Sequence, residues 1–259
     1  MQRSSWRLFA TPSRNGLMEY SRNIGLVCSV DQECGKIMSE MRDIKYLHTG
    51  PVTLLSGSIG RKKVILVITG IGKVNASHGA TILTGEYRPS CVINFGIGGC
   101  YPASGLSIGD VAVASKEFYA DEGVIMGDRF FSMEEAGMAI LQIGRKRYYN
   151  EFHPGAALMR IFRKKVAGMP INTGYGIFLT VSSVSGTIRR SEYLERSFGG
   201  VCENMEGAAV FHVAHMYKTA CFEVRGISNI AGIRDKRKWN FRKAAENCQA
   251  VLLEFIGGL

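Results

Sequence analysis

Short apolar runs that alternate with helix-like stretches constrain the fold of this chain more than any other feature. Two of them, NIGLVCSV from residue 23 and CVINFGIGGCY from residue 91, are apolar at nearly every position. Continuous apolar strands are typical of sheets that helices cover on both faces. The pattern predicts a single-domain α/β fold with three layers, α/β/α, around a mixed and twisted central sheet. Ligands of open α/β sheets bind beyond the carboxyl ends of the strands.

The alternation runs from residue 23 to residue 259 without a linker, an internal repeat or a low-complexity block. A chain of this length can bury a sizeable core, so we expect one domain over 23–259. Residues 1–22 are predicted to be a disordered tail. Their Arg- and Ser-rich sequence lacks the apolar centre of a secretory signal.

Three segments combine strand-like sequence with polar or glycine-rich ends. TLLSGSIGRKKVILVITGIG, from residue 53, predicts a hairpin around residues 59–61. CVINFGIGGCY predicts a buried strand that runs into a glycine-rich turn. FEVRGISNIAG, from residue 222, predicts a strand with a polar exit at Arg225, Ser228 and Asn229.

The region 124–170 is less regular than the rest and richer in charged and aromatic residues. Its aromatic side chains Tyr148, Tyr149 and Phe152 could close over a substrate or fill the core. The sequence leaves both interpretations open.

The formal net charge is +10, and the basic residues are mostly dispersed. Such a charge favours solubility and can attract anionic small molecules. No basic run is interleaved with the aromatic motif of an RNA-recognition fold, so nucleic-acid binding is not expected. No apolar run approaches the ~20 residues of a membrane span, so membrane insertion is not expected either.

The seven cysteines are odd in number and include no C-x-x-C pair. This disfavours a zinc site or a disulfide framework and indicates the reducing cytoplasm. His212 and His215 share a helix face without a third ligand, which favours packing over metal binding. No G-x-S-x-G motif occurs, which disfavours serine hydrolysis. We expect neither a metal nor a cofactor.

Two glycine-rich segments, GIGKVN (70–75) and FGIGGCY (95–101), superficially suggest dinucleotide loops. Each places another residue, Asn75 or Tyr101, where G-x-G-x-x-G requires its last glycine. They are either tight turns between packed elements or loops whose N–H groups face a sugar or an anion. Two carboxylates, Glu33 and Glu206, follow strand ends. Either could complement a helix dipole or take part in chemistry.

Taken together, six segments resemble the nucleoside phosphorylase/nucleosidase superfamily, which includes the methylthioadenosine/S-adenosylhomocysteine nucleosidases. In chain order these are CSVDQEC, TGIGKVNA, NFGIGGCY, IGDVAVAS, ENMEGAAV and VRGISN. The likeness spans about 24–259. Within the superfamily, FGIGGCYPASGLSIGDVAVAS, TVSSVSGT and RGISNIAGIRDKRKW look most like the futalosine hydrolases. The resemblance implies release of hypoxanthine from futalosine in bacterial menaquinone biosynthesis, by a homo-oligomer of two or more subunits.

The resemblance also implies roles for individual residues. Glu33 falls on the family's water-activating glutamate. Met205 and Glu206 fall on its ribose-binding pair, with the carboxylate accepting from the sugar hydroxyls. Asn229 falls on the polar residue that faces the purine.

The glycine segment at Gly98, with Ile97 and Gly99, falls beside the sugar. Adenine-releasing relatives often have a hydroxyl residue near Ile97, and this chain has none. The loop that contains Ser183 and Val184 flanks the base.

These residue types suit the chemistry of N-glycoside hydrolysis. The reaction passes through an oxocarbenium-like sugar and an electron-rich leaving group, as in glycosidases. Glu33 can orient the attacking water, and such positioned proton transfer contributes ~10²–10⁴-fold. Asn229 can donate from its amide to the departing purine. An amide suits a 6-oxopurine, whose O6 and N7 are both acceptors, whereas an ionised carboxylate would repel both.

Several alternatives remain open at this stage. Phosphorolysis is disfavoured because the two glycine segments contain no arginine and Glu33 would repel phosphate. Arg234 could attract the benzoate carboxylate of futalosine, or could serve solubility alone. The rivals are an adenine-releasing nucleosidase acting on methylthioadenosine, S-adenosylhomocysteine or aminodeoxyfutalosine, a purine nucleoside phosphorylase, and a non-catalytic nucleoside-binding protein. The expected partner is a purine nucleoside with an anionic tail.

Overall fold

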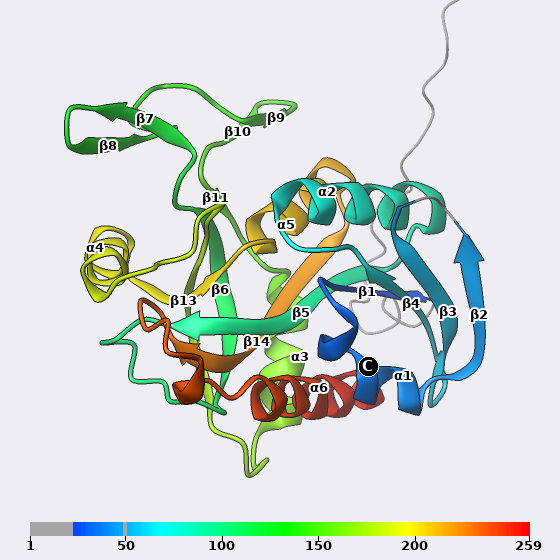
Figure 1. The fold of residues 1–259 in the computed structure, drawn as a ribbon. Coiled ribbons are helices and arrows are strands. Elements are labelled where there is room, and N and C mark those ends of the chain that lie inside the picture. The colour runs from blue at the N-terminus through cyan, green and yellow to red at the C-terminus, as the bar shows by residue number, and fades with distance from the viewer. Residues whose placement is uncertain (1–22, 49–50) are drawn as a thin grey trace, which may run out of the picture.

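The structure is a computed structural model that describes residues 23–48 and 51–259. The predicted tail, residues 1–22, lies outside the described residues. A central sheet lies between two groups of helices, which confirms the expected single-domain, three-layer α/β fold (Figure 1). Within the described ranges, the helices are too short or too polar to cross a bilayer.

The central sheet contains ten strands in the order β11-β6-β12-β13-β5-β1-β4-β3-β2, with β14 paired to both β5 and β6. Its strands are β1 (Asn23–Cys28), β2 (Arg42–His48), β3 (Thr53–Ile59), β4 (Lys62–Ile68), β5 (Cys91–Cys100), β6 (Val111–Tyr119), β11 (Glu151–Phe152), β12 (Thr173–Thr180), β13 (Gly200–Asn204) and β14 (Ala220–Ile230). Two small hairpins lie outside it: β7 (Gly123–Met126) with β8 (Arg129–Ser132), and β9 (Leu141–Ile143) with β10 (Lys146–Tyr148).

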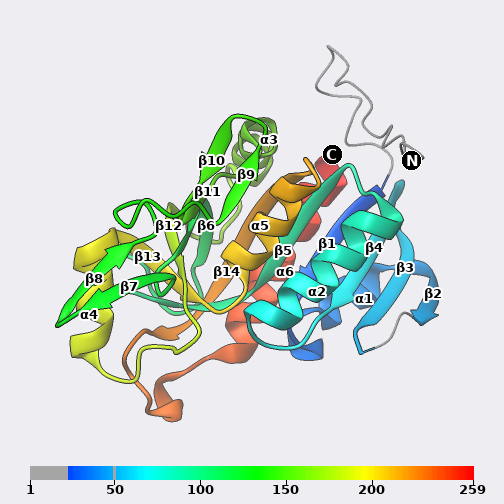
Figure 2. The same ribbon diagram turned by 90° about the horizontal axis from the view of Figure 1, so that it is seen from above.

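Two groups of helices cover opposite faces of the sheet (Figures 1 and 2). One group contains α2 (Lys73–Ile82), which continues as the π-helical turn η3 (Leu83–Tyr87), and α5 (Gly207–Met216). The other contains α1 (Gly35–Glu40), α3 (Ala156–Val166) and α6 (Phe241–Gly258). Helix α4 (Ile188–Phe198) and the short turns η2 (Asp31–Glu33) and η4 (Lys236–Lys238) complete the list.

Each face of the sheet has its own apolar core. On one face, buried side chains of α3 and α6, such as Phe162 and Phe255, pack on Phe222 of β14. On the other face, small residues of α2 and α5 such as Ala80 and Ala209 allow the two helices to lie close together over the sheet. The double burial explains why the inner strands β1 and β5 are apolar at nearly every position.

Five strands of the sheet form a closed ring. Strand β5 pairs with β13 and β14, β14 pairs with β6, and β6 is joined to β13 through β12. Strand β5 therefore has strand neighbours on both sides near its carboxyl end, where the glycine-rich sequence lies.

Two sequence expectations about polar and glycine-rich ends are wrong. The glycines 96, 98 and 99 belong to strand β5, which continues to Cys100, so they form no turn. Likewise, Arg225, Ser228 and Asn229 lie inside β14, which extends to Ile230. In both cases pairing with neighbouring strands extends the element beyond the point where local propensity would end it.

The irregular region 124–170 contains the two hairpins, β11 and α3. Phe152 is fully buried, stacks on Tyr148 with ring centroids 5.7 Å apart, and packs on His212 and His215. Of the two interpretations left open by the sequence, core packing therefore describes Tyr148 and Phe152. The same contacts show that the two half-buried histidines pack against Phe152.

Candidate active site

A cavity of about 850 Å³ lies where β5, β13 and β14 meet the loops after β1, β4 and β12. All nine residues predicted for the site line it. They are Glu33, Ile97, Gly98, Gly99, Val184, Met205, Glu206, Asn229 and Arg234. Its size falls within the usual range for small-molecule sites, roughly 300–1,000 Å³.

Glu33 lies at one end of the cavity on the turn η2, and it is only 4% exposed. Its Oε1 accepts a hydrogen bond from the N–H of Ile97 over 2.8 Å, and its Oε2 accepts one from the N–H of Ser29 over 2.9 Å. Burial raises the pKa of Glu33, while the nearby Arg225 and the two N–H groups lower it, with a net upward shift. A fixed carboxylate with a raised pKa is suited to accepting a proton from water.

Gly96 is required next to Glu33. Its φ of +155° is unfavourable for a residue with a side chain, and a methyl group there would overlap the Glu33 carboxyl group. The missing side chain makes room for Glu33 against the middle of the sheet.

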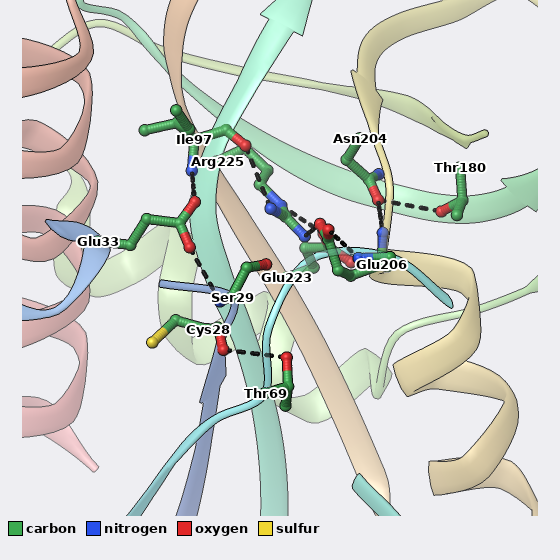
Figure 3. A network of polar contacts seen from close by, with 12 residues as sticks. Cys28, Ser29, Glu33, Thr69, Ile97, Thr180, Asn204, Glu206, Glu223 and Arg225 are labelled. Atoms are coloured by element: carbon green, nitrogen blue, oxygen red, sulfur yellow. Dashed lines mark hydrogen bonds and ion pairs between the residues drawn. The ribbon is translucent and has the colours of Figure 1, made fainter. Parts of the chain in front are cut away.

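Arg225 lies at the centre of the site and is almost fully buried, with 1% exposure (Figure 3). Its Nε contacts Glu223 Oε1 at 2.8 Å, its Nη2 lies 3.3 Å from Glu206 Oε2, and its Nη1 donates to the carbonyl of Ile97 over 3.1 Å. Burial alone would lower the pKa of Arg225, but Glu223, Glu206 and Glu33 outweigh it and raise the pKa. The guanidinium is thus a permanent charge that holds two carboxylates in place.

Glu206 is the N-terminal capping residue of α5, yet its own side chain does not cap the helix. Asn204 does so instead, because its Oδ1 accepts from the N–H groups of Glu206 and Gly207 at 2.9 and 2.7 Å. The Glu206 carboxylate is therefore free to face the cavity, where Oε1 accepts from the N–H of Gly72 over 3.0 Å.

Behind this group lies a buried pair of acids, Glu117 on β6 and Glu223 on β14, both without solvent exposure. A side chain at Gly207 would overlap both carboxyl groups. Burial and the neighbouring Glu223 raise the pKa of Glu117 well above its usual range. Burial also raises the pKa of Glu223, but Arg225 lowers it, so Glu223 is the acid of the pair that favours the charged form.

Asn229 lines the cavity away from Glu33, next to a β-bulge in β14. Ile227 pairs with Gly98 and Asn229 pairs with Gly99, so Ser228 is an extra residue in the ladder. Such bulges redirect side chains near active sites. Ser228 donates from its hydroxyl to Asn229 Oδ1 at 2.8 Å, and Asn229 Nδ2 donates to the carbonyl of Ile230 at 3.1 Å. The amide nitrogen retains a second N–H that can be donated to a ligand.

Arg234, Trp239, Phe241 and Arg242 lie at the border of the cavity. Arg234 lies over the ring of Trp239, 4.7 Å from its centroid, and the Trp239 indole donates to the carbonyl of Ile233 at 2.8 Å. Arg242 is paired with Glu246, whereas Arg234 contacts no carboxylate in the described part of the chain. The charge of Arg234 is therefore available to an anionic group.

Sequence reasoning did not assign Arg225, Glu223, Glu117 or Glu203 to the site. The signal for three of them was present: a charged residue within an otherwise apolar strand, as in FEVRGIS and VAVASKEF, must be paired when it is buried. Across residues 23–48 and 51–259, no cluster of His, Cys, Asp and Glu side chains could hold a metal ion.

The chain is similar to known proteins in both sequence and fold. Residues 23–257 match the Phosphorylase superfamily. The chain is 27% identical over 236 residues to the 5'-methylthioadenosine/S-adenosylhomocysteine nucleosidase of Oceanobacillus iheyensis, covering 90% of this chain and 98% of that protein. It is 33% identical over 178 residues to the futalosine hydrolase of Thermus thermophilus, covering 68% and 73%.

The fold also matches solved structures. The nucleosidase from Neisseria meningitidis in complex with methylthio-immucillin-A superimposes with a TM-score of 0.79 at 20% identity. The match covers 92% of this chain and 99% of that one. At this level of identity the likeness shows the fold alone.

Proposed function

Since the chain belongs to the phosphorylase superfamily and is a nucleosidase, an N-glycosyl hydrolase, we propose that it hydrolyses futalosine and releases hypoxanthine. The observation that carries this proposal is Asn229. An amide, and not a carboxyl group, lies at the end of the cavity opposite Glu33. The similarity of the chain to the futalosine hydrolase of Thermus thermophilus supports the same substrate.

In the proposed reaction, water attacks the anomeric carbon of the ribose as the bond from that carbon to the purine nitrogen breaks. Glu33 accepts a proton from the water, so the new bond joins the anomeric carbon to a hydroxyl group. The electron pair of the broken bond leaves with the purine, which gains a proton from solvent, and Glu33 releases its own proton to solvent before the next cycle. The positioned base and the oriented donors each act on charge that develops in the transition state.

The ribose is proposed to lie between these ends, with its hydroxyl groups on Glu206. Arg225 and the N–H of Gly72 hold that carboxylate in one orientation. Two sugar hydroxyls can donate to the lone pairs that remain. Met205, next to Glu206, supplies an apolar surface that lines the same part of the cavity.

Asn229 favours a 6-oxopurine over adenine on chemical grounds. O6 and N7 of hypoxanthine are both acceptors, and the free N–H of the Asn229 amide can be donated to one of them. Adenine presents an amino group at position 6, which an Asp at this position would accept. Arg234 and Trp239 at the border provide a cation and an aromatic surface for the benzoate that distinguishes futalosine from inosine.

Release of adenine from 5'-methylthioadenosine or S-adenosylhomocysteine is the second candidate. The relatives that match this chain over nearly their whole length carry that name, so the comparisons support it more broadly than they support futalosine. Asn229 is the observation that argues against it.

Hydrolysis is favoured over phosphorolysis by the charges around the sugar position. Glu33 and Glu206 both line the cavity, and the buried cation near them, Arg225, is already engaged by Glu223 and Glu206. A phosphate dianion placed there would face two carboxylates.

The deciding experiment is to incubate the purified protein with futalosine, inosine and methylthioadenosine, with and without phosphate, and to identify the free base by chromatography. Hypoxanthine released from futalosine without phosphate is the expected result. Release of adenine with no turnover of futalosine would establish the second candidate instead. A strict phosphate requirement would rule out hydrolysis.

A further inference from the structure

Glu203, on strand β13, is a buried acid that the roles described so far do not use. Its side chain lines the cavity although only 6% of the residue is exposed. In the sheet, Glu203 pairs with Gly99 from one side of β5, and Asn229 pairs with Gly99 from the other. Two strand spacings of ~4.8 Å therefore separate the backbones of Glu203 and Asn229, which leaves about 10 Å between them.

Among the described residues, the hydrogen bonds to the Glu203 carboxyl group come from Ser185 and Tyr101, both donors. Oε1 accepts from the N–H of Ser185 at 2.8 Å, and Oε2 accepts from the Ser185 hydroxyl at 2.6 Å and the Tyr101 hydroxyl at 3.3 Å. Burial and the charge of Glu203 raise the pKa of Tyr101, so its hydroxyl stays protonated and donates. A carboxylate can accept about four hydrogen bonds, so one position remains for a ligand.

The same contacts exclude a hydrogen bond from the backbone of Ser185 to the base. The N–H of Ser185, in the loop after β12, is bonded to Glu203 and is not available to a ring nitrogen of the ligand. The Glu203 carboxylate at this wall of the cavity is an acceptor.

We propose that Glu203 determines base specificity by accepting a hydrogen bond from N1–H of a 6-oxopurine. This inference rests on the proposed function of the site. Hypoxanthine carries a hydrogen on N1, whereas N1 of adenine is a lone pair that would face the carboxylate. Asn229 then contacts the O6 and N7 side of the base and Glu203 contacts its N1 side, from the two strands that flank Gly99.

The first test uses the unmodified protein and measures binding, not turnover. Calorimetry compares hypoxanthine, 1-methylhypoxanthine and adenine. A site built to bond an N–H group rejects analogues that lack it by large factors, so we expect hypoxanthine to bind at least ~100-fold more tightly than either analogue. Adenine also lacks a hydrogen on N1 but carries no methyl group, so it separates the loss of the N–H group from the added bulk of 1-methylhypoxanthine. Equal binding of hypoxanthine and 1-methylhypoxanthine would overturn the inference.

The second test compares Glu203→Gln with Ser185→Ala. The glutamine can present an N–H group to N1 of adenine, so the ratio of hypoxanthine to adenine affinity should fall at least ~10-fold in E203Q. Ser185→Ala removes a hydroxyl contact and keeps the carboxylate, so the ratio should be preserved in S185A. If the ratio of affinities changed equally in both variants, Glu203 would act only by holding the loop that contains Ser185, and the inference would fail. An unchanged ratio in E203Q would also refute it.

These outcomes separate the two proposals. If the wild-type protein releases hypoxanthine from futalosine but binds 1-methylhypoxanthine as well as hypoxanthine, only the role of Glu203 fails. If it releases adenine and does not act on futalosine, the proposed function fails first. Because the first test needs no substitution, the inference stays testable even if E203Q does not fold.

Discussion

Ile97 donates its backbone N–H to Glu33 Oε1 over 2.8 Å. The carbonyl of Ile97 accepts from Arg225 at the same time. One residue in the middle of a buried strand thus connects the candidate base to the cation that holds Glu206. The position of Glu33 therefore depends on strand β5 as well as on its own turn, η2.

Replacing Gly96 with alanine should disrupt this arrangement. The added methyl group would overlap the Glu33 carboxyl group and force it from the Ile97 N–H. We expect kcat/KM to fall about 100-fold, the scale of a displacement of roughly 1 Å in a catalytic group. Gly35→Ala is the matched control, because Gly35 has open space around it and begins α1. Full activity in G96A would show that Glu33 needs no fixed position.

The pH dependence of kcat/KM should report the ionisation of Glu33. The carboxylate must be charged to accept a proton, so activity falls as pH falls through the pKa of Glu33. Burial raises that pKa above the ordinary value of 4.5, so the midpoint of the acid limb should lie above pH 4.5. In Glu33→Gln the residual activity should lack this limb. A wild-type midpoint at or below 4.5 would contradict the assignment.

Asn229→Asp should change which base is released. An ionised carboxylate would repel O6 and N7 of a 6-oxopurine, and the variant loses one donor to the transition state. We expect at least a ~100-fold loss of kcat on futalosine, measured by hypoxanthine release. Activity on methylthioadenosine in the same preparation should rise or stay constant, which controls for folding. Unchanged turnover of futalosine would refute the role of Asn229.

Arg234→Gln should weaken binding of a substrate with an anionic tail. The KM for futalosine should rise roughly fivefold, which corresponds to one partly exposed ion pair of up to about 1 kcal/mol. The KM for inosine, which lacks the carboxylate, should not change. Arg237→Gln is the control, since Arg237 is exposed, is paired with Asp235 and does not line the cavity. Equal effects on both substrates would exclude a specific contact with the tail.

Glu117→Gln should change how stability depends on pH. Burial and the neighbouring Glu223 raise the pKa of Glu117 in the folded protein, and unfolding removes both causes. The stability that protonated Glu117 contributes is fully present below the pKa of the unfolded state and is lost as pH rises through the pKa of the folded state. Over that range the free energy of unfolding falls by about 1.4 kcal/mol per pH unit for one proton.

Urea unfolding of the wild type and E117Q at several pH values measures that slope. Between about pH 5.5 and 7 the wild-type free energy of unfolding should fall more steeply than that of E117Q, by up to the value for one proton. Glu254→Gln, at an exposed position on α6, should keep the wild-type slope. Parallel slopes for the wild type and E117Q would place an ionised Glu117 in the folded state.

The alternation of apolar runs and helices was sufficient to predict the fold class, since inner strands of the sheet such as β1 and β5 are buried along most of their length. The strand β2 was missed because Arg42–His48, RDIKYLH, is an edge strand whose polar residues resemble a loop. The glycines of β5 were read as a turn for a related reason. Local propensity cannot indicate that two neighbouring strands will pair along a glycine-rich segment.

The residues of the candidate site were predicted from a resemblance, and the structure places all of them around one cavity. The supporting charges were harder to foresee. Arg225, Glu223 and Glu117 come from two strands far apart in the sequence, and only the pairing of β14 with β6 brings them together. A single buried charge can be noticed in a sequence, but its partner cannot be identified without the fold.

Strand β5 sets the length of the cavity. Gly96 lies against Glu33, and Gly99 lies between Asn229 and Glu203. The extended chain from Gly96 to Gly99 spans about 10 Å. This is comparable with the distance across a nucleoside, from the attacking water next to the sugar to the far edge of the base. An insertion or deletion in this short segment would therefore alter the size of nucleoside that fits, even if every polar side chain were kept. Changes to the base preference, by contrast, can be confined to Asn229 and Glu203, which lie beside Gly99 at one end of this segment.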